Sequence, residues 1–278
     1  MKLSIITINY NDANGLQKTI ESIRHQSYQD FQYIVVDGNS HDGSKEIMDQ
    51  HLDFIDIAIS EPDTGIYNAM NKGAKEAIGE YLLFINSGDE LYNKSTLESV
   101  FNLSFCEDIV SGITLNYSEK ISIKEVPPKD ISLYSFVSGS LPHCSTLIKN
   151  TLFKKIGGYR ENYRIISDWC FFVEALIKHR CSYKTISTTI ARFNLYGISS
   201  TSSNKEENEK FSFLEELFGK RIMKDYLPPK DECLSNCIYW ISTREGTLHS
   251  FLTIPFKILN RFLRLRNNLG KRVGVYIH

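Results

Sequence analysis

The sequence predicts an α/β protein built on a mostly parallel sheet flanked by helices. Two observations carry this prediction. Short apolar runs with a β-branched bias alternate with segments whose apolar residues recur at helical spacing, and this strand–helix unit occurs three times before residue 80. With 278 residues, 42% of them hydrophobic and 23% charged, the chain is long enough for one sizeable core plus an appendage.

The strand–helix units can be placed along the chain. Residues 3–8 form the first apolar run, Asp12 or Asn14 then caps a helix, and the apolar positions of that helix start at Leu16. The later elements are expected as a strand at 31–36, a helix at 44–50, a strand at 54–59, a helix from about Gly65 to just before Gly79, and a strand at 81–85. Three such units in succession predict a Rossmann-like, nucleotide-binding half.

The second half of the chain is less regular. A strand is expected near 108–114, Pro127-Pro128 interrupts the chain, and the polar segment 199–209 is typical of a mobile loop. Pro228-Pro229 then precedes a basic tail. We expect a domain at 1–220, composed of a nucleotide-binding half at 1–105 and a pocket-shaping half at 106–220, and a helical tail at 221–278.

An acidic turn, Asn86-Ser87-Gly88-Asp89, directly follows the apolar run at 81–85. Open α/β sheets bind ligands beyond the carboxyl ends of their strands. Asp89 would therefore lie where a hard cation can bridge it to a diphosphate. The alternative is a plain helix-capping loop.

The first two strands end in an aromatic residue and an acid. The segment Asn9-Tyr10-Asn11 lacks the Gly-x-Gly-x-x-Gly pattern, which argues against NAD or FAD. The ring of Tyr10 suits stacking on a base, and the carboxylate of Asp37 suits a hydrogen bond to a base or ribose. Alternatively, Tyr10 packs on the rim of the sheet and Asp37 only turns the chain.

Several segments, taken in order, resemble family 2 of the inverting glycosyltransferases. They are residues 4–11 (SIITINYN), 22–28 (SIRHQSY), 35–44 (VVDGNSHDGS), 79–81 (GEY) and 86–89 (NSGD). Residues 61–73 (EPDTGIYNAMNKG) resemble in particular the bacterial members that assemble surface polysaccharides. The resemblance covers about residues 1–200, and the tail lies outside it.

The resemblance implies a GT-A fold, a nucleoside-diphosphate sugar (most often of UDP) and a divalent metal, Mn²⁺ or Mg²⁺. By position it places Tyr10 and Asp37 on the nucleoside, Asp63 and Asn71 in the donor pocket, and Asp89 at the metal, as the second acid of an Asp-x-Asp motif. The first acid of that motif is Ser87 here, at most a weak oxygen ligand. The metal would then rest on Asp89 and the donor phosphates, as suits an ion that keeps several waters.

Inversion requires a base that takes the proton of the acceptor hydroxyl. Asp168, in the segment Tyr163–Trp169, lies about eighty residues after the acidic turn, where the resembling family carries its base. A helix cap is the alternative role of this aspartate, and the two roles are compatible.

Two further residues are implied near the diphosphate. His143, next to Pro142, matches a histidine that the family often places there, and the absence of a second pair with ligand spacing argues against a zinc site with Cys144. Arg192 is a candidate for neutralising the leaving diphosphate. A surface ion pair is the alternative for Arg192.

The tail differs in charge from the rest of the chain. Residues 244–278 contain seven Lys or Arg and one acid, whereas the remainder contains 25 basic and 32 acidic residues. On a helical wheel the apolar and basic residues of the tail separate, apart from Arg266. This predicts a helix on an anionic membrane surface, with no role for nucleic acid. The alternative is a helix docked on the domain or on the second subunit of a homodimer.

The sequence thus predicts a metal-dependent inverting glycosyltransferase that moves a hexosyl or N-acetylhexosaminyl unit from a nucleotide sugar to a saccharide or lipid-linked saccharide in bacterial polysaccharide assembly. Scattered cysteines, no signal peptide and no apolar run of about 18 residues favour a cytoplasmic protein, peripheral on the inner face of the cell membrane. Two alternatives stay open: a sugar-nucleotide or polysaccharide-binding protein without turnover, and a sugar nucleotidyltransferase.

Overall fold

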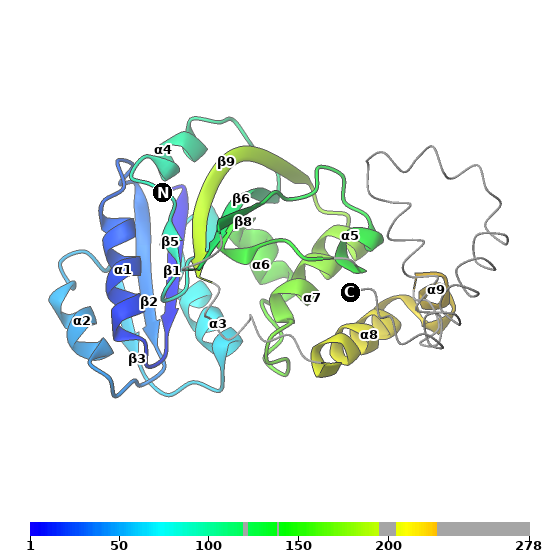
Figure 1. Cartoon of the computed structure of the whole chain (residues 1–278), viewed down its shortest axis with the longest axis horizontal. Coiled ribbons are helices and arrows are strands. Elements are labelled where there is room, and N and C mark those ends of the chain that lie inside the picture. The colour runs from blue at the N-terminus through cyan, green and yellow to red at the C-terminus, as the bar shows by residue number, and fades with distance from the viewer. Residues whose placement is uncertain (119–121, 138, 195–203, 227–278) are drawn as a thin grey trace, which may run out of the picture. The chain divides into compact units, whose positions relative to one another are not determined.

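The computed structural model describes residues 1–118, 122–137, 139–194 and 204–226 (Figure 1). Its strands are β1 (Leu3–Asn9), β2 (Phe31–Asp37), β3 (Ile57–Ser60), β4 (Tyr81–Phe84), β5 (Glu90–Leu91), β6 (Ile109–Tyr117), β7 (Ser122–Glu125), β8 (Thr146–Lys149) and β9 (Tyr183–Asn194). Its helices are α1 (Ala13–Arg24), α2 (Ser44–Gln50), α3 (Ile66–Glu76), α4 (Thr96–Phe101), α5 (Leu133–Val137), α6 (Asn150–Ile156), α7 (Ser167–Val173), α8 (Asn204–Phe218) and α9 (Lys220–Tyr226), with a 3-10 turn η1 (His143–Ser145) and a π-helical turn η2 (Glu174–Lys178).

The described strands form one sheet in the order β3-β2-β1-β4-β8-β6-β9-β5, with β7 paired to β6. β1 is parallel to β2 and β4, and β2 is parallel to β3, as predicted for the first half. Beyond β4 the sheet is mixed, because β8 runs antiparallel to both β4 and β6 while β9 is parallel to β6. The carboxyl ends of β1, β2 and β4 therefore meet at one edge.

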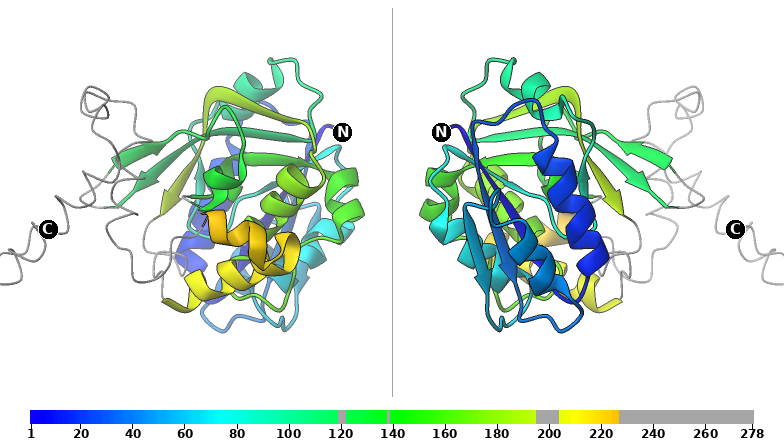
Figure 2. Two further views of the ribbon diagram at one scale, coloured as in Figure 1. Left: turned by 90° about the vertical axis from the view of Figure 1, so that its right-hand side faces the viewer. Right: turned by 90° about the vertical axis from the view of Figure 1, so that its left-hand side faces the viewer.

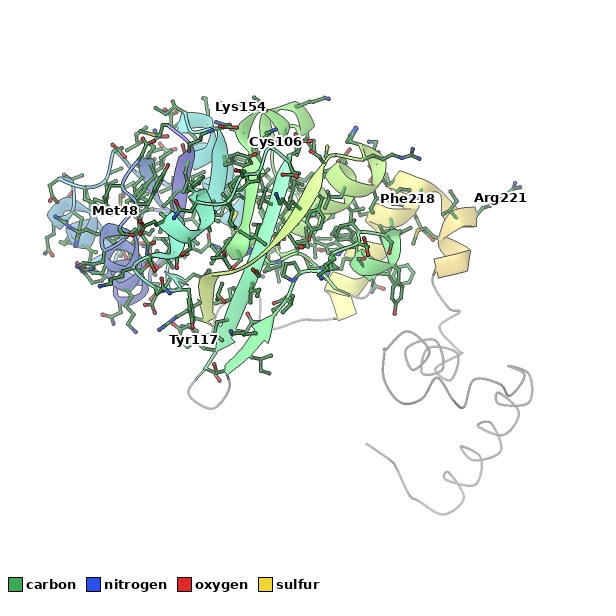
Figure 3. All side chains as sticks on the ribbon, turned by 90° about the horizontal axis from the view of Figure 1, so that it is seen from above. Met48, Cys106, Tyr117, Lys154, Phe218 and Arg221 are labelled. Atoms are coloured by element: carbon green, nitrogen blue, oxygen red, sulfur yellow. The ribbon has the colours of Figure 1, made fainter. Side chains whose placement is uncertain are left out.

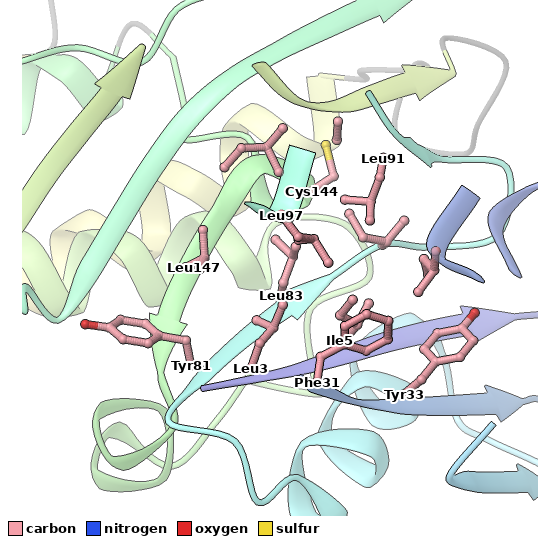
Figure 4. Packing of buried hydrophobic residues seen from close by; sticks show 14 of the residues in the cluster. Leu3, Ile5, Phe31, Tyr33, Tyr81, Leu83, Leu91, Leu97, Cys144 and Leu147 are labelled. Atoms are coloured by element: carbon pink, nitrogen blue, oxygen red, sulfur yellow. The ribbon is translucent and has the colours of Figure 1, made fainter. Parts of the chain in front are cut away.

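One face of the sheet is covered by α1 and α2. Asp12 accepts a hydrogen bond from the backbone N–H of Gly15 at 3.0 Å, which confirms the predicted cap of α1. The apolar side of α1 is buried in one core with strand residues such as Leu3, Phe31 and Leu83 (Figure 4). Each fully buried side chain of this size contributes about 1.5–3 kcal/mol, so this core fixes α1 on the sheet.

The opposite face carries α3, α6 and α7 (Figure 2). A Cβ added to Gly73 of α3 would lie 2.6 Å from Cγ2 of Ile6, so the helix can approach the sheet only with glycine there. Further along, the rings of Phe84, Phe153 and Phe171 contact one another in tilted pairs, with centroids 5.7 and 5.3 Å apart. This aromatic column joins β4 to α6 and α7.

Two expected elements differ in the structure. The third strand begins at Ile57 and not at residue 54, because the backbone N–H of Phe54 closes a turn onto the carbonyl of His51 at 2.9 Å. The loop predicted at 199–209 is wrong from Asn204 onward, where α8 begins. A helix can tolerate a polar first half when apolar residues follow on one side, as they do from Phe211. Residues 199–203 lie outside the described residues.

The chain divides into two compact units, Met1–Phe213 and Leu214–His278. The boundary predicted at residue 220 stays a prediction. The amphipathic helix predicted within 244–278 falls outside the described residues. Among the helices of the described ranges, none combines the length and apolar character needed to cross a membrane.

Candidate active site

A cleft of about 1040 Å³ opens at the edge where β1, β2 and β4 end. Residues that directly follow these strands line it: Tyr10 after β1, Gly38 after β2, and Ser87 and Asp89 after β4. Parallel α/β sheets bind their ligands at this edge. The volume is at the upper end of the range of small-molecule sites.

The acidic turn is anchored on both sides. The backbone N–H of Ser87 bonds to the carbonyl of Ile8 at 3.0 Å, which continues the ladder beyond β1. Gly88 has φ +89°, a conformation that favours glycine. The hydroxyl of Thr19 in α1 accepts from the N–H of Gly88 at 3.1 Å and donates to the carbonyl of Asp89 at 2.7 Å. Helix α1 therefore fixes the backbone of the predicted metal ligand.

The carboxylate of Asp89 is buried with little compensation. The residue is 4% exposed, and its Oδ1 accepts the backbone N–H of Asn194 at 3.3 Å. Burial raises the pKa of Asp89 to about 7, although the positive charge of His143 opposes this. A desolvated carboxylate of this kind favours a cation beside it.

The residues around Asp89 fit a divalent ion that takes most of its ligands from phosphate and water. The described part of the chain contains no group of three His, Cys, Asp or Glu that could hold a metal ion. The hydroxyl of Ser87 donates to Asp12 Oδ2 at 3.1 Å, and Asp12 also lines the cleft. A second carboxylate is thus in contact with the position where the Asp-x-Asp pattern lacks its first acid.

Tyr10, Gly38 and Asp63 lie together at the end of the cleft beside β1 and β2. Tyr10 is 67% exposed and lines the cleft. A Cβ on Gly38 would lie 2.5 Å from Asp63 Oδ2 and 3.1 Å from Tyr10 Cδ2, so the glycine permits this close approach. The other carboxylate oxygen of Asp63 accepts the N–H of Gly65 at 2.9 Å, which orients the side chain. Tyr10 and Asp63 are two of the residues predicted to bind the donor.

Asp37 is placed differently from the prediction. It is fully buried and is not among the residues that line the cleft. Its Oδ1 accepts from Asn9 and from the Ser40 hydroxyl at 2.8 and 2.6 Å, and its Oδ2 accepts from the Ser40 N–H and the Ser60 hydroxyl at 2.9 and 3.1 Å. Protein donors thus occupy both oxygens. In this structure Asp37 builds the turn after β2, which is the structural alternative considered from the sequence.

Asn71 is not among the residues that line the cleft, although its partner Glu161 is. Its amide donates to the carbonyl of Tyr159 at 2.8 Å and to Glu161 at 2.9 Å, and its oxygen accepts the N–H of Tyr159 at 2.9 Å. The residue therefore joins α3 to the segment before α7. One turn earlier on α3, Asn68 lines the cleft instead.

Arg192 lies outside both the cleft and the cavity described below. Arg192 lies opposite Glu90 in the register of the antiparallel strands β5 and β9. Its guanidinium carbon lies 5.3 Å from the ring centre of Tyr92. Side chains alternate along a strand, and the next residue, Phe193, is the one that lines the cleft. This geometry does not support a contact between Arg192 and the diphosphate, and the role of Arg192 stays a prediction.

Asp168, the predicted base, lies on the first turn of α7 between two partners. The hydroxyl of Tyr67 donates to Asp168 Oδ1 at 2.7 Å and also lies against the carbonyl of Ile165. Nδ1 of His143 lies 3.5 Å from Asp168 Oδ2. The N-cap position of α7 is Ile166, so Asp168 lies within the first turn of the helix and is not its N-cap residue.

The protonation of these groups is coupled. Burial alone would raise the pKa of Asp168, but the hydrogen bond and charge of His143, with the Tyr67 hydroxyl, lower it. Burial alone would lower the pKa of His143, but Asp168, with a contribution from Asp89, raises it. Burial and the charge of Asp168 raise the pKa of Tyr67 well above its ordinary value. The stable arrangement is therefore an imidazolium, a carboxylate and a neutral phenol.

Asn86 contacts the other ring nitrogen of His143. Its amide nitrogen lies 3.1 Å from His143 Nε2, and its buried oxygen has no hydrogen-bond partner among the described residues. With the amide nitrogen donating, this contact fits a neutral imidazole, and exchanging the two amide positions would let the oxygen accept from Nε2–H of an imidazolium.

Asp168 lines a second cavity of about 300 Å³ beside the cleft. Tyr67, Asn86 and His143 line both spaces, whereas Asp168 lines only the cavity and Asp89 only the cleft. The two carboxylates thus serve adjoining compartments that share one wall.

Several residues of this site were not predicted, among them Tyr67 and Arg164. Tyr67 reads as one more apolar position of α3, and its partner Asp168 is 101 residues away in sequence. Arg164 lines the cleft and adds a cation there. Arg164 could have been found from the sequence, because it lies in the segment Tyr163–Trp169, which also contains Asp168.

A sheet of this kind, with an acidic turn at its ligand-binding edge and a paired carboxylate beside it, is typical of enzymes that transfer sugars from nucleotides. Comparison with known proteins agrees. The sequence model described as Glycosyl transferase family 2 matches residues 4–156, more than half of the chain. The chain belongs to this family and is a glycosyltransferase.

Named relatives and a solved structure are consistent with this membership. An uncharacterized glycosyltransferase of Mycobacterium tuberculosis (strain CDC 1551 / Oshkosh) is 29% identical over 252 residues, which cover 86% of this chain and 94% of the relative. A PGL/p-HBAD biosynthesis glycosyltransferase of Mycobacterium bovis (strain BCG / Pasteur 1173P2) is 29% identical over 212 residues, 73% of this chain and 81% of the relative.

Among solved structures, S. aureus TarS in complex with UDP-GlcNAc aligns with a TM-score of 0.65 at 18% identity. The alignment covers 78% of this chain and 65% of that one, so this chain spans just under two thirds of the TarS chain. The likeness shows the fold and confirms the predicted GT-A-like α/β fold with a sheet flanked by helices, although the sheet is mixed and not mostly parallel as predicted.

Proposed function

We propose that this chain is an inverting glycosyltransferase that moves a hexosyl or N-acetylhexosaminyl unit from a UDP-sugar to a saccharide or lipid-linked saccharide of a bacterial cell envelope. The observation that carries the proposal is the placement of Asp89 and Asp168 in adjoining compartments with His143 between them. The UDP-GlcNAc of the TarS complex and the PGL biosynthesis named for the mycobacterial relative support the donor and the envelope product.

The cleft would hold the donor. The exposed ring of Tyr10 offers a stacking surface for the base, and Asp63 beside it offers an acceptor for a nucleoside donor group. Arg164 and protonated His143 supply positive charge for the diphosphate, in place of Arg192. Asp37 and Asn71 act indirectly, through the turn and the helix that they hold.

Asp89, with water and the donor phosphates, would hold Mn²⁺ or Mg²⁺, and the bound ion supplies positive charge for the diphosphate leaving group. Ser87 contributes through Asp12, since its hydroxyl already donates to that carboxylate.

Asp168 is the proposed base. The acceptor oxygen bonds to the anomeric carbon on the side opposite the diphosphate as its proton passes to Asp168. The bond between the anomeric carbon and the phosphate oxygen breaks, and the electron pair leaves with the nucleoside diphosphate, so the anomeric configuration inverts. Once Asp168 is protonated, it no longer neutralises the positive charge of His143, and this charge can then stabilise the leaving diphosphate.

A thermal-shift panel tests the proposed donor directly. The full chain is heated with UDP-, GDP-, CMP- and dTDP-sugars, with and without Mn²⁺, because a ligand that binds the folded state raises the melting temperature by mass action. We expect a UDP-sugar to give the largest rise in melting temperature, and we expect this rise to be smaller without Mn²⁺. A shift equal for all four nucleotides, or none, contradicts the proposed donor.

The tail would keep the enzyme at its acceptor. We propose that residues 244–278 bind the anionic inner face of the cell membrane through their basic side while their apolar residues enter the interface. Docking on a second subunit remains the alternative for this segment.

A further inference from the structure

We propose that the 300 Å³ cavity beside the cleft is the subsite for the acceptor, and that Glu125 and Asn116 select an uncharged saccharide unit there. The inference rests on the proposed function, since it names the second substrate of the same site.

The position of the base assigns the cavity. A hydroxyl that gives its proton to Asp168 must lie within hydrogen-bond reach of that carboxylate. Asp168 lines the small cavity and does not line the large cleft. Asp89 has the opposite placement, so the diphosphate and the acceptor would approach the shared wall of Tyr67, Asn86 and His143 from different sides.

The lining of the cavity matches one sugar ring. Met70 and Leu141 provide apolar surface, while Thr114, Asn116 and Glu125 provide polar groups from β6 and β7. A pyranose has an apolar C–H face and hydroxyls around its edge, so it needs both kinds of lining. A volume of about 300 Å³ is small for a longer saccharide, which would have to continue into the solvent.

Glu125 is oriented by its neighbour. Asn116 Nδ2 donates to Glu125 Oε2 at 2.9 Å across the pair β6 and β7, which holds the carboxylate in place. Figure 3 shows β6 running out to Tyr117, with β7 beside it. A fixed carboxylate accepts hydroxyl protons strongly, since hydrogen bonds to charged groups exceed neutral ones. This makes Glu125 a specificity residue for hydroxyl groups on the acceptor.

The charges of the cavity determine which acceptors are disfavoured. Asp168 and Glu125 both carry carboxylates into a space of limited size. The imidazolium of His143, which lines the same cavity, offsets the charge of Asp168 and leaves that of Glu125. A uronic acid or a phosphorylated sugar would add a further negative charge beside Glu125, which like-charge repulsion opposes. The proposed acceptor class is therefore a neutral pyranose at the end of the growing chain.

The test measures transfer by the full chain from a UDP-sugar to methyl glycosides of glucose, galactose, mannose, N-acetylglucosamine and glucuronic acid. We expect wild-type protein to use neutral glycosides and to discriminate against the glucuronide. Glu125→Gln should raise KM for the best neutral acceptor roughly tenfold or more, while KM for the donor stays near its wild-type value. The same change should narrow the discrimination against the glucuronide, because one repelling charge is gone.

Two further variants guard the interpretation. Asn116→Ala removes the group that orients Glu125 and should raise the KM for the acceptor by a smaller factor than Glu125→Gln does. Glu46→Gln makes the same Glu-to-Gln change at an exposed position of α2. This control should leave the KM for the donor and the KM for the acceptor within about twofold of wild type. An unchanged acceptor KM in Glu125→Gln, in protein whose melting temperature equals that of wild type, overturns the inference. So does wild-type protein that hydrolyses its donor but glycosylates no neutral sugar. Failure to consume any nucleotide sugar would instead refute the proposed function itself.

Discussion

The hydroxyl of Tyr67 and the imidazole of His143 determine how Asp168 can act as a base. A buried aspartate without partners would hold its proton near neutral pH and could not accept another. Here both carboxylate oxygens have partners, at 2.7 Å from Tyr67 and 3.5 Å from His143. The pKa of Asp168 is lowered in spite of burial, so the side chain is ionised before the acceptor arrives.

The pH profile of His143→Asn tests this relation. The variant keeps a neutral donor but loses the positive charge, so burial is no longer offset and the pKa of Asp168 rises. Because Asp168 must be ionised to accept a proton, the acidic limb of kcat/KM should move to higher pH. His25→Asn, an exposed histidine at the end of α1, is the control. If the acidic limb of kcat/KM lies at the same pH in His143→Asn as in wild type, His143 does not control the pKa of Asp168.

A pair of tyrosines gives a matched test of the other partner. Tyr67→Phe removes the donor to Asp168, and turnover should fall by about tenfold, the scale of one hydrogen bond to a charged group. Tyr159→Phe makes the same change in a ring whose centre lies 5.4 Å from that of Tyr67, but the buried hydroxyl of Tyr159 has no hydrogen-bond partner within the described part of the chain. Steady-state kinetics should therefore show little loss for Tyr159→Phe. Equal losses in the two variants would mean that the site responds to packing and not to the hydrogen bond.

Chemical denaturation of the same two variants provides a second readout. A buried hydroxyl without a partner costs about 1–3 kcal/mol, so Tyr159→Phe should have an unfolding free energy equal to or above that of wild type. A clear destabilisation of Tyr159→Phe would show that its hydroxyl has a partner in solution.

The sequence could select Asp168 and Asp89 as candidates because each lies in a segment whose order and spacing resemble a known family. It could not identify Tyr67, since the contact that gives this tyrosine a role depends on a segment 101 residues away. The sequence also could not show that Asp37 is buried, because a carboxylate that turns the chain and one that faces a ligand occur in the same sequence pattern.

At the scale of elements, α3 connects the two compartments. Its first turn carries Tyr67 to the base, and its middle is held close to the sheet by Gly73. Asn71 ties the same helix to the segment that leads into α7. A shift of α3 would therefore move the donor cleft and the base together.

Gly73→Ala tests the packing of α3. The added methyl would lie 2.6 Å from Cγ2 of the fully buried Ile6, so strain of about 1–3 kcal/mol should exceed the helix-propensity gain of about 1 kcal/mol. We expect a lower free energy of unfolding by urea denaturation, with reduced activity. Lys75→Ala, on the exposed side of the same helix, should change stability by less than about 0.5 kcal/mol. Equal stability of Gly73→Ala and wild type would show that α3 is not tightly packed.

Strand–helix alternation predicted the elements of the first half well, because buried parallel strands appear as continuous apolar runs. The second half could not be derived in the same way. Its antiparallel insertions β8 and β7 depend on pairings between distant segments, and the helical start of α8 lies in a polar stretch that carries no hydrophobic periodicity.

At the scale of the whole molecule, the remaining prediction concerns the basic tail. If residues 244–278 bind an anionic surface, the full chain should sediment with vesicles that contain anionic lipid and much less with neutral vesicles, and high salt should weaken this binding. Arg261→Gln with Arg264→Gln should reduce sedimentation, since each basic residue contributes about 1 kcal/mol near such a surface. A full chain that does not sediment with anionic vesicles would instead favour a tail docked on the domain or on a second subunit.

We propose that one compartment binds the donor through Asp89 and that the other accepts the proton of the acceptor through Asp168. One comparison of variants tests these separate roles directly. Binding of the UDP-sugar in the presence of Mn²⁺ is measured by calorimetry, and transfer is measured with the same preparations of wild type, Asp89→Ala and Asp168→Asn. Asp89→Ala should lose both metal-dependent donor binding and transfer, whereas Asp168→Asn should bind the donor normally and lose turnover by about 10²-fold or more. Near-normal turnover in Asp168→Asn, or unchanged metal-dependent binding in Asp89→Ala, would contradict these roles.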